Sequence, residues 1–310
     1  MNKFTCRACR HEEFSEDFVC KDFYSGNLEY QHVYAVCAHC NSLSISKFFD
    51  SGEEIYNEDY YSLDISGRKH GLKDFLYKIL FNVSYYAGIH FLAAREYLLY
   101  REFRKLRVAK GAAIVDIGCG GGEFLKRLQF LGYENISGID PFFIESDGND
   151  KSLNIRKKSI YNLDGLYDVI IAHHVIEHVN SPIIFMADVA RLLSESGKAL
   201  VCFPTYGGVT KVFKEHSYIV QAPQHACLIS ASGFLKICED SGLKVCTTIR
   251  SSESDLNWAL VSNCWKNGVY VKSFDEISNE KCSPEFRDLV THWELSGDGS
   301  NLLFIVEKNN

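Results

Sequence analysis

Hydrophobic residues between positions 112 and 205 follow a repeated strand–turn–helix pattern. AAIVDIG (112–118) is an apolar run that predicts a buried strand, and EFLKRLQFLG (123–132), after a glycine-rich turn, has apolar residues at helical spacing. Further strands are predicted at NISGID (135–140), LNIRKKSI (153–160) and YDVIIA (167–172). A helix is predicted at 181–195, with Ser181 as its cap and Pro182 at its first position. The alternation predicts an α/β fold.

The two ends of the chain have different patterns. Near the N-terminus, residues 18–26 and 28–37 predict a β-hairpin with its turn at Gly26-Asn27. Near the C-terminus, residues 244–250 and 301–309 predict strands, separated by helical segments at 256–268 and 284–297. We therefore expect an N-terminal domain (1–50), a linker and helical region (51–110), and an α/β domain (111–310) with an insertion at about 252–300. The insertion is expected to close over substrate or to form a subunit contact.

Composition restricts the function. The chain has 310 residues and a formal net charge of −7, which disfavours a general nucleic-acid binder. The basic run 101–110 is interpreted as a solvated helix face. Lys78, His90 and Arg95 interrupt the apolar stretch 76–98, so we expect an amphipathic helical segment and no membrane insertion. Without an apolar signal-peptide core at its start, the chain is expected to be cytoplasmic, with its 12 cysteines reduced.

Four cysteines form two C-x-x-C pairs within the first forty residues, at Cys6/Cys9 and Cys37/Cys40. Each pair can place two thiolates on one ion at a tight turn, so together they predict a four-cysteine structural zinc site. The four thiolates would close the coordination shell, so this metal would stabilise the fold rather than catalyse. Cys20 and the cysteines at 119, 202, 227, 238, 246, 264 and 282 are expected to pack in the core.

The glycine-rich turn GCGGG (118–122) follows a strand and opens a helix, so its backbone amides can approach a ligand closely. Asp140, at the end of the next predicted strand, is placed to bind ribose hydroxyls. The spacing G-x-G-x-G differs from the dinucleotide fingerprint G-x-G-x-x-G. Glu123 directly after the turn fits a cationic sulfonium better than a pyrophosphate.

His174, Glu177 and His178 match H-x-x-E-H, the zinc motif of inverted zinc-peptidases. That motif requires a long helix, but Asn180, Ser181 and Pro182 end the segment almost at once. The segment instead follows a predicted strand, at whose carboxyl end an α/β sheet binds its ligands. We interpret Glu177 and His178 as packing residues, with orientation of a neighbouring ring as the alternative.

VDIGCGGGEF, GID, YDVIIAHHVIEHVNSP and LLSESGKALVCFPT together resemble the motif series of class I S-adenosylmethionine-dependent methyltransferases. The resemblance implies a Rossmann-like seven-stranded sheet with its last strand antiparallel, and S-adenosylmethionine as cofactor. Carried over by position, Gly118, Gly120 and Gly122 would wrap the methionine portion, and Asp116 would support that turn. Asp140 would bind the ribose, and Ser159 and Ile160 would flank the adenine.

The four cysteines, the motif Tyr56-x-x-x-Tyr60-Tyr61 and this domain together are similar to zinc-ribbon methyltransferases of deoxysugar and surface-polysaccharide pathways. From the sequence given, we expect no counterpart of the extra C-terminal domain of the sugar C-methyltransferases. The resemblance implies a small, carbohydrate-type acceptor. RNA methylation using the ribbon, and cofactor binding without catalysis, are the alternatives.

Histidines expected at the rim of the cofactor cleft supply the candidate catalytic groups. We expect His173 to contact the cofactor and His174 to act as general base. His225, Tyr206 and His216 are further candidates, because their loops are expected on the same rim. The sequence does not indicate the methylated atom or the oligomeric state.

Overall fold

A computed structural model describes residues 4–23, 26–48, 76, 79, 83, 98–144, 153–252, 254–272, 274–277 and 284–309. Contacts divide the chain into two compact units. The first contains residues 1–50, 174–187 and 202–304, and the second contains residues 51–173, 188–201 and 305–310. The predicted linker with Tyr56, Tyr60 and Tyr61, Cys282, and most of the predicted helical region before residue 98 lie outside the described residues.

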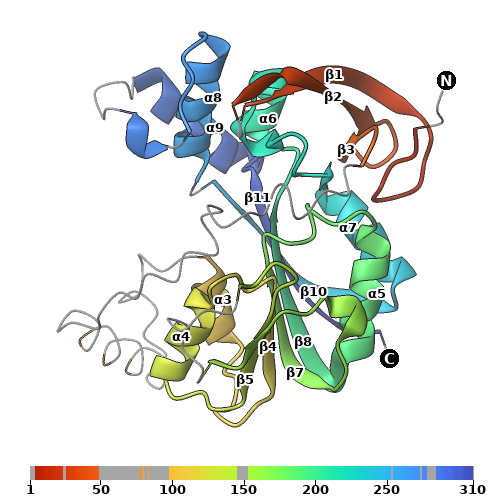
Figure 1. Cartoon of the computed structure of the whole chain (residues 1–310), viewed down its shortest axis with the longest axis vertical. Helices are drawn as coiled ribbons and strands as arrows, with labels where there is room; N and C mark the ends of the chain where they lie inside the picture. Colours follow the sequence, from red (N-terminus) through yellow and green to blue (C-terminus); the bar gives the residue numbers. More distant parts are fainter. Residues whose placement is uncertain are drawn as a thin grey trace. The chain divides into compact units, whose positions relative to one another are not determined.

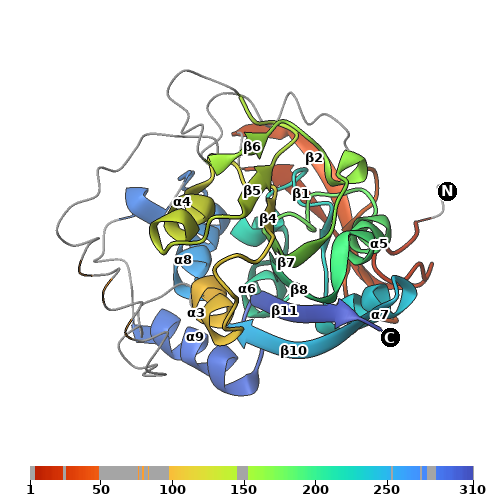
Figure 2. The same ribbon diagram turned by 90° about the horizontal axis from the view of Figure 1, so that it is seen from below.

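Seven strands form one mixed sheet in the hydrogen-bonded order β10-β11-β8-β7-β4-β5-β6. Strand β4 is parallel to β5 and to β7, and β5 is parallel to β6 (Figure 2). The predicted seven-stranded α/β sheet is therefore confirmed. The strand bounds are β4 Ile114–Ile117, β5 Ile136–Ile139, β6 Ile155–Arg156, β7 Tyr167–His173, β8 Leu193–Pro204, β10 Leu243–Ser251 and β11 Asn301–Lys308.

The predicted helices are present with small differences at their ends. Helix α5 begins at Pro182 as predicted, and the Ser181 hydroxyl accepts a hydrogen bond from the Ile184 amide at 3.4 Å. It ends at Leu192 rather than at residue 195, because Leu193 is already a fully buried residue of β8. The helix bounds are α3 Leu98–Lys105, α4 Glu123–Phe130, α5 Pro182–Leu192, α6 Gly208–Phe213, α7 Ala231–Asp240, α8 Asp255–Lys266 and α9 Pro284–Ser296.

A second, four-stranded antiparallel sheet lies in the first unit (Figure 1). Strands β1 (Phe14–Asp22) and β2 (Asn27–Cys37) form the predicted N-terminal hairpin, with Val19 opposite Val33. Strand β3 (Leu43–Ile45) pairs with β2 and also with β9 (Cys227–Leu228), where Leu43 lies opposite Leu228. The N-terminal hairpin therefore shares its sheet with a strand from the C-terminal half of the chain.

One expectation about burial is wrong, and a second, the solvated basic run, is wrong at one of its basic residues. Cys246 is exposed, because the alternation of β10 places it on the same side as the exposed Lys244 and Thr248. In the basic run, Arg104 is buried together with Glu102, whose carboxylate pairs with Arg101 and Lys105. Among the described residues no disulfide is present, and none of the described helices is long and apolar enough to cross a membrane.

Candidate functional site

The register of the parallel strands brings the predicted cofactor residues of the second unit to one edge of the sheet. Ile117, the last residue of β4, is paired with Ile139 of β5 and with Ala172 of β7. Gly118, Asp140 and His173 are the next residues along their strands. Because the strands are parallel, these residues reach the carboxyl edge at the same level, where an α/β sheet binds its ligands.

The turn after β4 requires glycine at three positions. Gly118, Gly120 and Gly122 have φ angles of 68°, 51° and 76°, which residues with a Cβ rarely adopt. A Cβ on Gly122 would lie 2.5 Å from Cδ1 of Ile155. The turn leads directly into α4, which begins at Glu123. This places a backbone segment that carries only one side chain, that of Cys119, at a helix N-terminus, a geometry that fits close approach by a ligand.

Two buried carboxylates support this turn. Asp140 accepts hydrogen bonds from the amides of Gly120 (3.1 Å) and Phe142 (2.8 Å). Burial and the nearby charge of Asp140 raise the pKa of Asp116 to about 8. Burial also raises the pKa of Asp140, although its two amide donors oppose the shift. The two raised pKa values show that this edge of the sheet is well shielded from solvent, and a cationic ligand bound there would favour the ionised form of both acids.

The residues predicted to flank the adenine follow β6 after a short connection. Ser159 precedes a 3-10 turn at Ile160–Asn162, and the side chain of Ile160 is buried. The carbonyl oxygen of Leu163, at the end of this turn, accepts a hydrogen bond from Arg191 at 2.9 Å. Ser159 and Ile160 therefore lie on an anchored segment just after the carboxyl end of β6.

His174 follows β7 directly and belongs to the first unit. Its ring contacts the carboxylate of Glu177, which lies three residues further along the same turn. Its Nδ1 lies 3.0 Å from Oε1 of Glu177, and its side chain is 30% exposed whereas that of Glu177 is fully buried. Burial would raise the pKa of Glu177, but the hydrogen bond with His174 and the nearby histidine charges lower it to about 2. Residues 174–181 form turns rather than a helix, so the helical peptidase arrangement is absent here.

His178 and His225 lie beside the same carboxylate. Nδ1 of His178 is 3.1 Å from the Gln224 carbonyl oxygen, and Nδ1 of His225 is 2.6 Å from that of Ile219. Burial and the neighbouring His178 lower the pKa of His225 to about 3. The sequence did not indicate that His178 and His225 would meet, because 46 residues separate them.

Tyr206, the third predicted catalytic residue, is mostly buried and faces the N-terminal hairpin. Its hydroxyl donates a hydrogen bond to Oε1 of Glu16 at 2.8 Å, and Lys214 pairs with the other oxygen of Glu16 at 2.7 Å. Burial and the Glu16 contact raise the pKa of Tyr206 above its usual range. Nothing in the sequence of residues 14–22 marked Glu16 as its partner.

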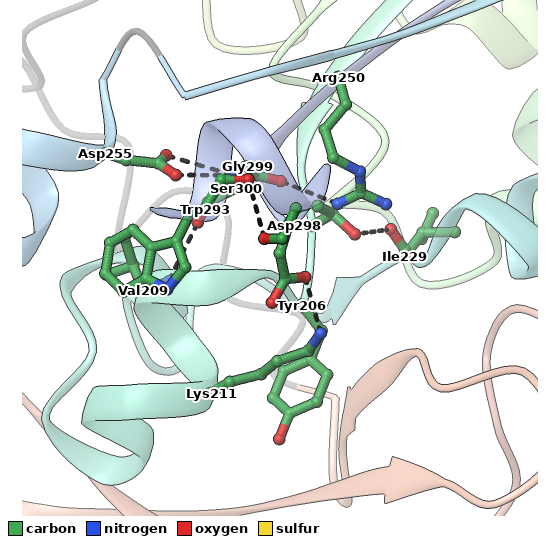
Figure 3. A network of polar contacts seen from close by, with 12 residues as sticks. Tyr206, Val209, Lys211, Ile229, Arg250, Asp255, Trp293, Asp298, Gly299 and Ser300 are labelled. Atoms are coloured by element: carbon green, nitrogen blue, oxygen red, sulfur yellow. Dashed lines mark hydrogen bonds and ion pairs between the residues drawn. The ribbon is translucent and has the colours of Figure 1, made fainter. Parts of the chain in front are cut away.

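A polar network fixes the loop that carries Tyr206 (Figure 3). The Ser300 amide donates to both carboxylate oxygens of Asp255, at 3.2 and 3.0 Å, and the Ser300 hydroxyl accepts from the Val209 amide. Lys211 pairs with Asp298 at 2.7 Å. The start of α6 is therefore tied to the turn before β11.

The four predicted zinc ligands come together. Sγ of Cys6 lies 3.6 Å from that of Cys40, Sγ of Cys9 lies 3.5 Å from that of Cys37, and all four sulfurs lie within 4.8 Å of one another. A tetrahedral shell with zinc–sulfur bonds of about 2.3 Å separates its sulfurs by about 3.8 Å. The donor set and spacing therefore fit a tetrahedral metal ion.

The two cysteine turns repeat the same backbone geometry. The Arg10 amide donates to the Cys6 carbonyl oxygen (2.9 Å), and the Asn41 amide donates to that of Cys37 (3.0 Å). Arg10 and Asn41 both have positive φ angles, of 64° and 57°. Each C-x-x-C pair thus forms an equivalent turn.

A comparison with known families identifies the class of protein that this fold and site define. The family described as methyltransferase domain matches residues 91–248, more than half of the chain. The chain belongs to this family, and the predicted class, S-adenosylmethionine-dependent methyltransferase, is confirmed.

Among curated proteins, the chain is similar to several enzymes named ubiquinone biosynthesis O-methyltransferase. Ubiquinone biosynthesis O-methyltransferase of Rickettsia typhi is 30% identical over 138 residues, which cover 42% of this chain and 53% of that protein. The enzyme of the same name from Rhodopseudomonas palustris is 30% identical over 110 residues, which cover 33% and 43%. The chain thus spans about half the length of these relatives, and their names lend no support to a carbohydrate acceptor.

Among solved structures, the chain is similar to coclaurine N-methyltransferase bound to N-methylheliamine and S-adenosylhomocysteine. The sequence identity is 14% and the TM-score 0.46, with 83% of this chain and 81% of that chain covered.

Proposed function

We propose that the chain binds S-adenosylmethionine at the carboxyl edge of β4, β5 and β7 and transfers its methyl group to an oxygen of a small-molecule acceptor. The observation that carries this proposal is the shared register of Gly118, Asp140 and His173 in a chain of the methyltransferase-domain family. When bound, the cofactor supplies an activated methyl group on a sulfonium. The names of the curated relatives favour oxygen as the methylated atom.

In this proposal the second unit holds the cofactor. The amides of residues 118–122 approach the methionine portion, and Asp116 supports the turn that carries them. Asp140 binds the ribose hydroxyls, Ser159 and Ile160 flank the adenine, and His173 contacts the cofactor.

We assign the general base to His174 in preference to His225 and Tyr206. The His174 ring is partly exposed, whereas His225 is buried and the Tyr206 hydroxyl donates a hydrogen bond to Glu16. Glu177 accepts a hydrogen bond from Nδ1 of His174, which leaves Nε2 as the basic nitrogen. A neutral imidazole is suited to removing a hydroxyl proton near neutral pH.

We further propose that Cys6, Cys9, Cys37 and Cys40 hold one structural zinc ion. Four thiolates leave no open coordination position, so this ion stabilises the first unit and takes no part in methyl transfer.

Calorimetry with S-adenosylmethionine tests the cofactor site. We expect binding by the intact chain and at least tenfold weaker binding by Asp140→Ala. Absence of binding, or equal binding by the variant, would refute the proposed site. Radiolabelled methyl transfer to matched panels of dihydroxyphenols and nucleotide sugars then separates a phenol-type acceptor from the carbohydrate acceptor that the sequence resemblance implies.

A further inference from the structure

The first unit contains a second group of metal-ligating side chains besides the cysteines. Glu177, His178 and His225 each offer one ligand atom, and these atoms all lie within 4.8 Å of one another. The proposed methyl transfer uses only Oε1 of Glu177, as the acceptor for His174, and assigns no role to the other ligand atoms. The three residues come from the turn after β7 and from the segment before β9.

The carboxylate of Glu177 is only half satisfied. The side chain is fully buried, and Oε1 contacts Nδ1 of His174. The other oxygen, Oε2, is buried and has no hydrogen-bond donor among the described residues. An ionised carboxylate oxygen in such an environment is costly unless a donor or a cation compensates it. Oε2 therefore points to a ligand.

The hydrogen bonds of the two histidines select the nitrogen that can bind an ion. The carbonyl oxygens of Gln224 and Ile219 can only accept, so Nδ1 of His178 and of His225 carries the proton. The lone pair of each ring is then on Nε2. Metal-bound histidines are usually held in this way, with the second ring nitrogen donating to a backbone carbonyl or a carboxylate.

Backbone contacts hold the two contributing segments together. The Glu177 carbonyl oxygen accepts a hydrogen bond from the Ala226 amide at 2.7 Å, and the Tyr34 hydroxyl donates to the His225 carbonyl oxygen at 2.9 Å. The backbone positions of Glu177 and His225 are therefore each held by a hydrogen bond to the carbonyl oxygen. Ligand side chains that are already in position lose little conformational entropy when an ion binds.

We propose that Glu177, His178 and His225 bind one divalent first-row transition metal ion. Two imidazoles and one carboxylate form a ligand set typical of zinc, iron or cobalt, whereas magnesium and calcium prefer oxygen ligands alone. Oε2 of Glu177 binds the ion, and Oε1 keeps its hydrogen bond with His174. Three protein ligands leave further coordination positions for water or another small oxygen ligand, in contrast to the closed shell of the four cysteines.

Cobalt substitution tests this site on the full chain without any cofactor. After metal removal, Co²⁺ is titrated and followed by absorption, because thiolate ligands give charge-transfer bands that imidazole and carboxylate ligands lack. We expect a first equivalent with thiolate bands and a second equivalent without them. Glu177→Gln and His225→Gln should lose the second equivalent and keep the thiolate bands. His216→Gln, which changes a loop histidine of the same unit, should keep both.

Equal numbers of bound ions in the wild-type chain and in folded Glu177→Gln would overturn the proposal. If the variants do not fold, X-ray absorption of the metal-loaded wild-type chain decides. Nitrogen and oxygen scatterers in addition to sulfur are expected, and a shell of sulfur alone would contradict the site. Neither readout depends on methyl transfer, so failure here is distinguishable from failure of the proposed enzymatic activity.

Discussion

Nδ1 of His174 lies 3.0 Å from Oε1 of Glu177, a pair that joins a partly exposed imidazole to a fully buried carboxylate. His174 has a φ angle of 56°, and its amide donates to the Cys202 carbonyl oxygen at 2.8 Å. Both the ring and the backbone of His174 are thus held in one orientation. This is the arrangement expected for a histidine whose second nitrogen receives a proton.

Replacing His174 tests its role as general base. We expect His174→Gln to lower kcat by about 10²- to 10⁴-fold, because a positioned base contributes that much to proton removal. Affinity for S-adenosylmethionine, measured by calorimetry, should remain within about twofold. His292→Gln, at an exposed position of α9, is the control and should retain wild-type kcat. A variant at residue 174 with normal kcat would exclude the assignment.

Two glycine-to-alanine variants, one at Gly122 in the cofactor turn and one at Gly132 after α4, separate the effect of steric overlap from that of backbone strain. A Cβ on Gly122 would meet Ile155 at 2.5 Å, whereas a Cβ on Gly132 would meet nothing within 4 Å, and both glycines have positive φ angles. We expect Gly132→Ala to lower the free energy of unfolding by about 1–2 kcal/mol through its φ angle alone. Gly122→Ala should cost about 1–3 kcal/mol more, through overpacking.

The same pair distinguishes an effect on cofactor binding from one on stability. S-adenosylmethionine should raise the melting temperature of Gly132→Ala as much as that of the wild-type chain, and that of Gly122→Ala much less. Equal shifts in the two variants would contradict a ligand site at residues 118–122.

Loss of the metal bound by the four cysteines should destabilise β9 as well as the N-terminal hairpin. Cys40 follows β2, and its carbonyl oxygen accepts a hydrogen bond from Ser232 at 2.9 Å, while Leu43 of β3 pairs with Leu228. We expect Cys37→Ser to lose one equivalent of zinc and to speed amide hydrogen exchange at residues 227 and 228 as well as in β2. Cys246→Ser, at an exposed cysteine, should change neither quantity. Exchange unaltered at residues 227 and 228 would show that β9 is held independently.

Asp255 makes stability depend on pH. Burial raises its pKa to about 7, although the hydrogen bonds from Ser300 oppose the shift. In the unfolded chain an aspartate has a pKa of about 3.9, so between pH 4 and pH 7 the folded chain binds a proton that the unfolded chain has released. This contribution to stability is complete below about pH 4 and is lost as the pH rises through about 7.

Asp255→Asn should remove this dependence, because asparagine keeps a carbonyl acceptor for Ser300 and does not titrate. Urea unfolding at pH 4.5 and pH 7.5 measures the effect. The decrease in the free energy of unfolding between the two pH values should be smaller in the variant by about 2–4 kcal/mol. An identical decrease in both chains would show that Asp255 is ionised throughout.

The sequence by itself determined the features that depend on neighbouring residues. The glycine turn could be predicted because Gly118, Gly120 and Gly122 adopt φ angles that other residues avoid. The cysteine turns could be predicted because C-x-x-C spacing brings two sulfurs together within one turn. The start of helix α5 could be predicted from Ser181 and Pro182, because helix capping also depends only on residues that are adjacent in sequence.

Only the tertiary structure decided which distant side chains meet. Tyr206 contacts Glu16 across 190 positions, and β9 joins the N-terminal sheet through pairing that no local pattern indicates. The letters H-x-x-E-H match a helical zinc motif, which the sequence excluded because Asn180, Ser181 and Pro182 end the segment. In the folded chain that segment is a series of turns, His174 contacts one oxygen of Glu177, and His225 approaches from a distant segment beside His178. Backbone pairing between segments sets these contacts, and its register depends on the whole fold rather than on neighbouring residues.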